Sequence, residues 1–238
     1  MLTSDFITPP PGHPLAGWLT GARDVVRLFV EGFGELFARC EGGIEGQVHE
    51  TATVSGEVVI GAGSRIHAHV HIEGPAVIGR NVSIRPHAII RPQTYLGDGC
   101  VVGHAADIKH AICMDGCKLQ DGVFVGDSLL GFGARVGSGV ITANRRFDQK
   151  KVMLSGPDGA VPTGLDFFSA VIGDYARIGA NAVLCPGTAV GPYTWVGPGV
   201  VLRGHYGPDL LILAEQALDI RPKPRTELRS GAGGYEVV

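Results

Sequence analysis

The sequence predicts an all-β fold, a single parallel β-helix built from stacked three-sided coils. Neither the period of a helix nor that of an ordinary strand explains a long run of apolar residues spaced six apart, whereas a coil with six-residue sides does. Repetition at a fixed period is typical of such solenoids. Every sixth position over a long stretch carries an aliphatic residue or Met: Val48, Val54, Ile60, Ile66, Ile72, Ile78, Ile84, Ile90, Leu96, Val102, Ile108 and Met114.

A second run with the same spacing extends the prism after a gap. Coils of three sides, stacked at roughly 4.8 Å, predict about seven coils and a column roughly 35 Å tall. Small or β-branched residues such as Ala52, Ser64 and Val70 follow four positions after the aliphatics, as a narrow interior requires. The second run is Ile172, Ile178, Leu184, Val190, Val196 and Leu202.

Composition limits the function classes. The 238 residues are 45% hydrophobic with a net charge of −3, so the chain can bury a core and lacks the basic excess of a nucleic-acid-binding protein. No membrane span or signal peptide is recognisable, so we expect a cytoplasmic protein. The five cysteines are expected to be reduced, and Cys113 and Cys117 lack the second pair of a zinc site, so no metal is expected.

Two terminal segments flank the predicted β-helix of residues 44–207. In residues 1–43, the proline-rich stretch 1–13 is expected to be poorly ordered. Apolar residues at helical spacing then predict one amphipathic helix over about 15–40, which would cap the end of the prism and shield its first coil. In residues 208–238, the apolar stretch Asp209 to Ile220 is expected to fold back on the last coil, ahead of a loose tail.

The six-residue rhythm breaks in the middle of the chain. Position 118 places Lys in a slot that is otherwise small and interior, and Val125 and Leu130 follow at five-residue steps. We therefore expect irregular packing here. Residues 143–171 are predicted to leave the prism as a long loop, and loops of that length in compact domains are usually functional or disordered. The break is where a site is expected.

Stacking in coils of about 18 residues turns the sequence into columns. Glu73, Arg91, Lys109 and Asp127 fall into one column, which is either a solvated charge ladder or, through Arg91 and Lys109, a phosphate site. A second column contains His69 and His87, followed by His104 near Asp121. These histidines are either ordinary surface residues or candidates for a general base.

The stretch Asp107 to Asp148, DIKHAICMDGCKLQDGVFVGDSLLGFGARVGSGVITANRRFD, resembles a known active-site region. It is similar to the left-handed β-helix acetyltransferase domain of archaeal-type bifunctional sugar-1-phosphate nucleotidylyltransferases, a hexapeptide-repeat family. The elements RP, IK, VGD and TAN occur in order, and the similarity runs from about residue 15 to Leu202. The resemblance implies a left-handed coil, a homotrimer with sites between neighbouring prisms, and acetyl-CoA-dependent N-acetylation of glucosamine-1-phosphate.

Site residues follow from the resemblance one by one. It implies that Arg91 and Lys109 bind the sugar phosphate and that Asn144 contacts the sugar. Phe124 replaces a tyrosine, so a hydroxyl contact is lost, and Arg135 replaces a sugar-binding asparagine. The positions along which the family binds CoA correspond here to Gly137, Ser138, Gly139 and Ala180.

The main departure from the family is at the expected catalytic histidine, where this chain has Asp121. An ordinary Asp is roughly 2.6 pKa units more acidic than His, which is a poor match for a base that takes a proton from an amine. Three outcomes are open. His104 could act as the base with Asp121 orienting it, burial could raise the pKa of Asp121, or the site could bind sugar phosphates without acylating them.

We therefore expect CoA-dependent acyl transfer to an amino or hydroxyl group of a sugar phosphate or nucleotide sugar. The alternative is a non-catalytic sugar-phosphate-binding or assembly subunit. No nucleotidylyltransferase half is present, so a separate nucleotidylyltransferase is an expected partner. A zinc-dependent γ-type carbonic anhydrase, using His87, His104 and His110, is disfavoured because five residues rather than four separate the last two.

Overall fold

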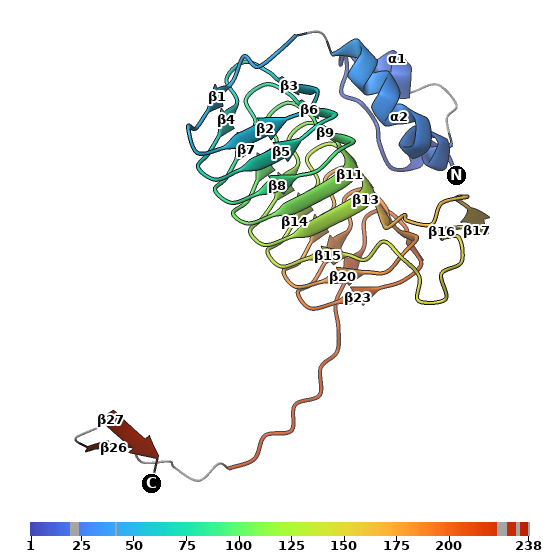
Figure 1. Ribbon diagram of the computed structural model, residues 1–238. Helices are drawn as coiled ribbons and strands as arrows, with labels where there is room; N and C mark the ends of the chain where they lie inside the picture. The colour runs from blue at the N-terminus through green and yellow to red at the C-terminus, as the bar shows by residue number, and fades with distance from the viewer. Residues whose placement is uncertain (20–23, 41, 223–227, 232–233, 238) are drawn as a thin grey trace.

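The protein folds as a left-handed parallel β-helix, a triangular prism with helices along one side and an extended C-terminal segment (Figure 1). The computed structural model describes residues 1–19, 24–40, 42–222, 228–231 and 234–237. Successive coils pair in parallel along three faces. The predicted fold class is confirmed.

Each face is a ladder of short strands. Face 1 contains β1 (Gln47–Val48), β4 (Arg65–Ile66), β7 (Ser83–Ile84), β10 (Val101–Val102), β12 (Lys118–Leu119), β14 (Arg135–Val136), β19 (Arg177–Ile178), β22 (Trp195–Val196) and β25 (Leu211–Ile212). Face 2 contains β2 (Thr53–Ser55), β5 (His71–Glu73), β8 (Ile89–Ile90), the first halves of β11 (Asp107–Cys113) and β13 (Phe124–Leu130), β15 (Ile141–Thr142), β20 (Val183–Leu184) and β23 (Val201–Leu202). Face 3 contains β3 (Val58–Ile60), β6 (Ala76–Ile78), β9 (Thr94–Leu96), the second halves of β11 and β13, β18 (Ala170–Ile172), β21 (Thr188–Val190) and β24 (His205–Tyr206).

The prism has more coils than the aliphatic period predicts. Face 1 has nine strands among the described residues, so there are nine coils and not about seven. Strands β12 and β14 continue the stack across the break in the period, and β25 adds a coil after the last predicted aliphatic. The interior of the stack is a continuous apolar column in which residues such as Ile60, Ile90 and Leu184 are fully buried.

Two consecutive coils are one residue short, which explains the break. Lys118 pairs with Val101, and Arg135 pairs with Lys118, each 17 residues further on. The missing residue is at the corner between faces 2 and 3, where His110 and Asp127 have positive φ angles of 43° and 48°. Strands β11 and β13 run through this corner without a turn.

The interior stays packed through the short coils, so the expectation of irregular packing is wrong. The shift brings Cys113 into the interior column, whereas Met114 faces outward into a second apolar cluster. Cys117 fills the small interior slot in which Lys118 was expected, Leu119 takes the following aliphatic position, and Lys118 is exposed. All five cysteines are free, as expected, and Cys113 and Cys117 are buried.

The N-terminal helical segment differs from the single helix expected over 15–40. Its described parts are α1 (Ala16–Leu19) and α2 (Val25–Arg39), and residues 20–23 lie outside the described residues. Asp24 has an extended backbone and its Oδ1 accepts the amide of Val26 at 2.8 Å, so α2 begins with its own N-cap.

These helices cover the side of the prism and not its end, so the predicted capping role is also wrong. Figure 1 shows α2 alongside face 3. Phe29 and Phe33 of α2 pack with outward residues of face 3 such as Tyr95, Ile112 and Leu129. Because face 3 is apolar on its outer side as well, it needs such a cover.

Residues 1–13 are attached to the prism, contrary to the expectation of poor order. Phe6 and Ile7 are 1% exposed. The amide of Thr8 donates to Asp174 Oδ2 at 2.7 Å, and the amide of Asp174 donates to the carbonyl of Phe6 at 2.9 Å. Apolar burial and these bonds outweigh the high proline content of the segment.

The long loop predicted at 143–171 is present. The chain leaves the prism after β15 and rejoins it at β18, and the loop contains the antiparallel hairpin β16 (Met153–Gly156) and β17 (Gly159–Pro162). Phe168, Val152 and Leu154 are fully buried in the cluster that also holds α2. The loop is therefore anchored beside the short coils.

The C-terminal segment only partly returns to the prism. Leu211 and Ile212 pair with β22 as the last strand of face 1. The prism therefore ends five residues beyond the expected boundary at 207. The chain then extends away from the prism, with Leu218 and Ile220 exposed (Figure 1). Two short strands, β26 (Leu228–Gly231) and β27 (Gly234–Val237), form a hairpin; residues 223–227, 232–233 and 238 of the expected tail lie outside the described residues. Among the described residues, no helix is long and apolar enough to cross a membrane.

Candidate functional site

Polar side chains gather at the corner between faces 2 and 3, where the coils are short. At their centre is the carboxylate of Asp127, which is 3% exposed. His110 Nδ1 lies 2.9 Å from Oδ1, Asn144 Nδ2 donates to Oδ2 at 2.6 Å, and Lys109 Nζ lies 3.4 Å from Oδ2. The predicted substrate-binding residues Lys109 and Asn144 thus meet on one carboxylate.

The surroundings of Asp127 keep this carboxyl ionised. Burial raises its pKa, but the hydrogen bonds from His110 and Asn144, together with the charge of Lys109, outweigh burial and hold the pKa below the ordinary value. A buried carboxylate with several donors fixes the orientation of each donor. Asp127 therefore acts as an anchor for the side chains around it.

Aromatic rings border this anchored cluster. Phe167, from the loop, is 37% exposed and lies 4.8 Å from Lys109 Nζ and 5.1 Å from the Arg145 guanidinium. Phe124, on face 2, lies 5.8 Å from the guanidinium of Arg91. Partly exposed rings with cations beside them suit a ligand that combines an apolar face with negative charge.

Arg91 is held in place by its own carboxylate. Its Nε and Nη2 donate to the two carboxylate oxygens of Asp107, both at 2.9 Å. Such a bidentate pair fixes the plane of the guanidinium. Arg91 and Lys109 are neighbours on face 2, because Ile90 pairs with Ile108. The predicted charge column therefore holds in register from Glu73 through Arg91 to Lys109, whereas in the next coil Gly126 pairs with Lys109 and Asp127 lies one position further on.

The histidine column lies at the corner between faces 1 and 2. The rings of His69 and His87 stack at 5.0 Å, and those of His87 and His104 meet edge to face at 5.4 Å. Asp121 Oδ1 accepts the backbone amide of His104 at 2.8 Å. Across the described residues, no hydrogen bond joins the Asp121 carboxylate to the His104 imidazole. The two predicted catalytic residues share a corner without forming a pair.

The predicted CoA-contacting residues continue along this same corner. The amide of Gly139 donates to the carbonyl of Asp121 at 3.0 Å, and the amide of Asn181 donates to the carbonyl of Ser138 at 2.9 Å. Gly139 has φ +71°, which glycine adopts without strain, and a Cβ there would lie 2.1 Å from Asn181 Oδ1. Ala180 is exposed beside Asn181. The structure thus groups the predicted base with the predicted CoA-binding backbone.

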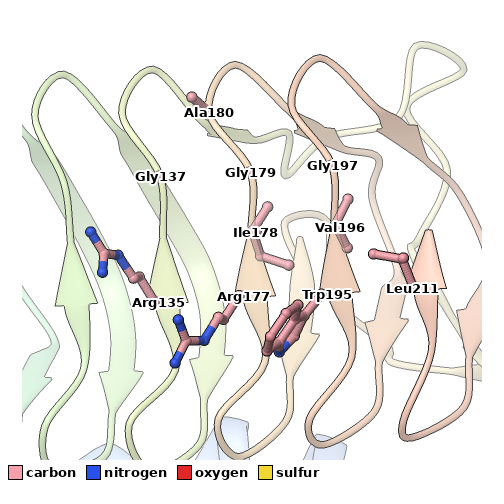
Figure 2. Close-up of a pocket in the computed structure, with 10 residues that line it drawn as sticks. All are labelled: Arg135, Gly137, Arg177, Ile178, Gly179, Ala180, Trp195, Val196, Gly197 and Leu211. Atoms are coloured by element: carbon pink, nitrogen blue, oxygen red, sulfur yellow. The ribbon is translucent and has the colours of Figure 1, made fainter. Parts of the chain in front are cut away.

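Face 1 has a shallow groove of about 430 Å³ next to this corner. Figure 2 shows the side chains of Arg135, Arg177 and Trp195 along it, with the backbone of Gly137 and Ala180 at its edge. The guanidinium of Arg177 lies 5.2 Å from the Trp195 ring. Arg135 was grouped with the sugar-binding residues, but the structure places it on face 1 beside the predicted CoA-binding positions and not with the face 2 cluster.

Sequence reasoning missed the pairing of His110 with Asp127. Stacking by 18 places Ser128 opposite His110, whereas the short coil brings Asp127 there, 17 residues ahead. The two five-residue steps in the aliphatic period were the available signal. Where the structure describes the chain, no group of three His, Cys, Asp or Glu side chains converges in a way that could hold a metal ion. His110 lies at a different corner from His87 and His104.

Comparison with known proteins agrees with this architecture. The family described as bacterial transferase hexapeptide (six repeats) matches residues 169–204, and the family described as GMPPB C-terminal domain matches residues 72–156. The chain belongs to the hexapeptide-repeat family. Its repeats are the six-residue sides of the prism.

The hexapeptide-repeat protein has relatives named as acetyltransferases. It is 32% identical over 162 residues to a bifunctional sugar-1-phosphate nucleotidylyltransferase/acetyltransferase of Sulfurisphaera tokodaii, covering 68% of this chain and 40% of that protein. It is 37% identical over 149 residues to an uncharacterized acetyltransferase, YaiX, of Escherichia coli strain 536, covering 63% and 65%. The chain thus spans about two fifths of the length of the bifunctional relative.

Two solved structures are weakly similar to this chain. A UDP-N-acetylglucosamine acyltransferase of Francisella novicida is 20% identical, with a TM-score of 0.38 over 66% of this chain and 60% of that chain. A mutant of the GDP-perosamine N-acetyl transferase of Caulobacter crescentus, in complex with CoA and GDP-perosamine, is 21% identical, with a TM-score of 0.31 over 80% and 63%.

Proposed function

We propose that this hexapeptide-repeat protein catalyses acyl transfer from acetyl-CoA to an amino or hydroxyl group of a sugar phosphate or nucleotide-linked sugar. One observation carries the proposal. Lys109, predicted to bind the sugar phosphate, and Asn144, predicted to contact the sugar, meet on the buried carboxylate of Asp127, beside the exposed ring of Phe167. A phosphate would bind the cations, and the sugar would lie against the rings.

The acyl donor is assigned to the neighbouring corner and the groove of face 1. The backbone of Gly137, Ser138 and Gly139 is accessible there, and Arg135 and Arg177 supply positive charge for the phosphates of CoA. His104 and Asp121 border this region. Acceptor and donor would then lie on adjacent faces, with the reacting atoms between them.

The proposal includes a homotrimer in which a neighbouring prism completes each site. Its support is the outer side of face 2, where Ile89, Ile141 and Val201 are 40%, 39% and 66% exposed. A second copy would cover these side chains and exclude water from the reacting groups. A separate nucleotidylyltransferase is a proposed partner. Light scattering on the purified chain measures the oligomer.

Isothermal titration tests the two binding assignments. We expect acetyl-CoA and glucosamine-1-phosphate to bind independently, and Lys109→Met to weaken only the sugar phosphate. Binding of the sugar phosphate without acetyl-CoA binding would instead favour the non-catalytic subunit. Binding of neither ligand, by a folded protein, would contradict the proposal.

A further inference from the structure

His110 and Asp127 form a histidine–carboxylate pair to which the proposed function assigns no catalytic role. Their contact, His110 Nδ1 to Asp127 Oδ1, is 2.9 Å long. Both residues have positive φ, and both lie where a coil is one residue short. The shortening therefore produces the pair, because it brings Asp127 opposite His110 on the next coil.

The charge state of Asp127 determines which imidazole nitrogen is free. An ionised carboxylate can only accept hydrogen bonds, so Nδ1 of His110 carries the proton and donates it to Oδ1. In the neutral ring, Nε2 is then left with its lone pair. A carboxylate behind Nδ1 also stabilises the imidazolium that forms when Nε2 takes a proton. This is the arrangement that a general base requires.

The pair lies within the cluster proposed to bind the acceptor. Lys109 and Asn144 hold the other oxygen of the same carboxylate, at 3.4 and 2.6 Å. The His110 side chain is 25% exposed, so a ligand can reach it. On its other side, the ring of Phe29 in α2 lies 4.5 Å away and limits how far the imidazole can rotate. The base would be oriented before the substrate binds.

His104 lacks this support. Its ring packs on His87, and Asp121 contacts its backbone amide and not its imidazole. Neither partner selects a tautomer for a base. Of His104 and His110, it is His110 whose imidazole contacts a buried carboxylate.

We propose that His110 is the general base of the acyl transfer and that Asp127 positions it. The inference rests on the proposed function. The acceptor nitrogen or oxygen attacks the thioester carbonyl of acetyl-CoA, the new C–N or C–O bond forms, and the C–S bond breaks. Nε2 of His110 takes the proton that the attacking atom loses and delivers it to the departing sulfur. The products are the acetylated sugar and free CoA, with His110 neutral again.

Replacement by glycine tests this directly, because glycine accepts the positive φ of position 110. His110→Gly should lower kcat by about 10²- to 10⁴-fold. Imidazole added to the buffer should restore part of the rate, since the vacated site can admit it. Asn81→Gly is the control, because Asn81 also has a positive φ at a prism corner and lies between faces 3 and 1, away from the proposed site. It should keep the wild-type rate and gain nothing from imidazole.

The outcomes separate the two proposals. Loss of kcat that imidazole relieves, with acetyl-CoA and sugar-phosphate affinities and Tm retained, supports the base assignment. A wild-type rate in His110→Gly overturns it, as does a loss that imidazole cannot relieve, which would assign His110 a structural role. If His110→Gly stays active while His104→Gln loses activity, the base lies at the other corner. An inactive wild-type protein overturns the proposed function itself.

Discussion

The carboxylate of Asp174 accepts the backbone amide of Thr8 at 2.7 Å across 166 positions of sequence. The other oxygen of Asp174 accepts the amide of Phe132 at 2.7 Å. One buried side chain therefore joins the N-terminal segment to two coils of the prism. The attachment of residues 1–13 depends on this contact as well as on the burial of Phe6 and Ile7.

Asp174 should make stability depend on pH. Burial raises its pKa to about 6, more than the amides of Thr8 and Phe132 lower it. The folded state then holds the proton more tightly than the unfolded chain. The stabilisation that protonated Asp174 gives the folded state is complete below about pH 4 and is lost as the pH rises through about 6. From this group alone, we expect the free energy of unfolding to fall by about 2 kcal/mol over that window.

Urea unfolding at pH 4.5 and pH 7 measures the effect. Asp174→Asn should lack this part of the decrease, because an amide does not titrate. Asp158→Asn, at an exposed carboxylate in the loop hairpin, should keep the wild-type pH dependence. Equal pH dependence in wild type and Asp174→Asn would contradict the assignment.

Lys109→Met should weaken binding of a sugar phosphate by roughly 10- to 100-fold, the range for loss of a charge-assisted hydrogen bond. Titration calorimetry measures it. Lys118→Met, an exposed lysine on face 1, is the control and should leave the affinity unchanged. Equal weakening in both variants would show that general charge, and not this cluster, attracts the ligand.

Arg177→Ala should weaken acetyl-CoA binding by roughly tenfold, because Arg177 supplies charge in the face 1 groove. Arg65→Ala removes an exposed arginine from the same face, several coils away from the groove, and should have no effect. The affinity for a sugar phosphate should be the same in both variants. An unchanged acetyl-CoA affinity in Arg177→Ala would remove the groove from the donor site.

Phe29→Ala should destabilise the protein by about 3–5 kcal/mol, since the ring is fully buried between α2 and the loop. Phe29 lies 5.0 Å from Phe168 and 4.5 Å from His110, so the loop and the proposed base should both loosen. Urea unfolding measures the stability. Val30→Ala, at a neighbouring exposed position, should change it by less than about 0.5 kcal/mol. Similar values for the two variants would mean that α2 is not firmly packed.

The six-residue period predicts the prism because each coil must bury one side chain per face in a narrow column. It fails at Met114 and Lys118, since a corner can lose one residue while the strands on both sides keep their pairing. The period reveals that a coil is one residue short, but it does not show at which corner the residue is missing. The packing of the N-terminal segment was harder to predict from the sequence. Its helices pack on the outer side of face 3, where apolar residues such as Leu129 lie far away in sequence.

The candidate site was predictable in its residues more than in its contacts. The resemblance brought Lys109 and Asn144 to the acceptor site, and the structure places them on one carboxylate. It grouped Arg135 with them, but a strand on face 1 points that side chain to a different surface. The pairing of His110 with Asp127 depends on a coil of 17 residues, which no column of 18 reveals.

The most direct test of the proposed function is the mass of the products formed from acetyl-CoA and glucosamine-1-phosphate, beside a panel of other amino sugars and nucleotide sugars. Product mass is preferable to thiol release, because the chain has five free cysteines. We expect at least one acceptor to gain a single acetyl group, with free CoA formed in equal amount. No acetylated product from any acceptor, by a folded protein that binds acetyl-CoA, would contradict the account.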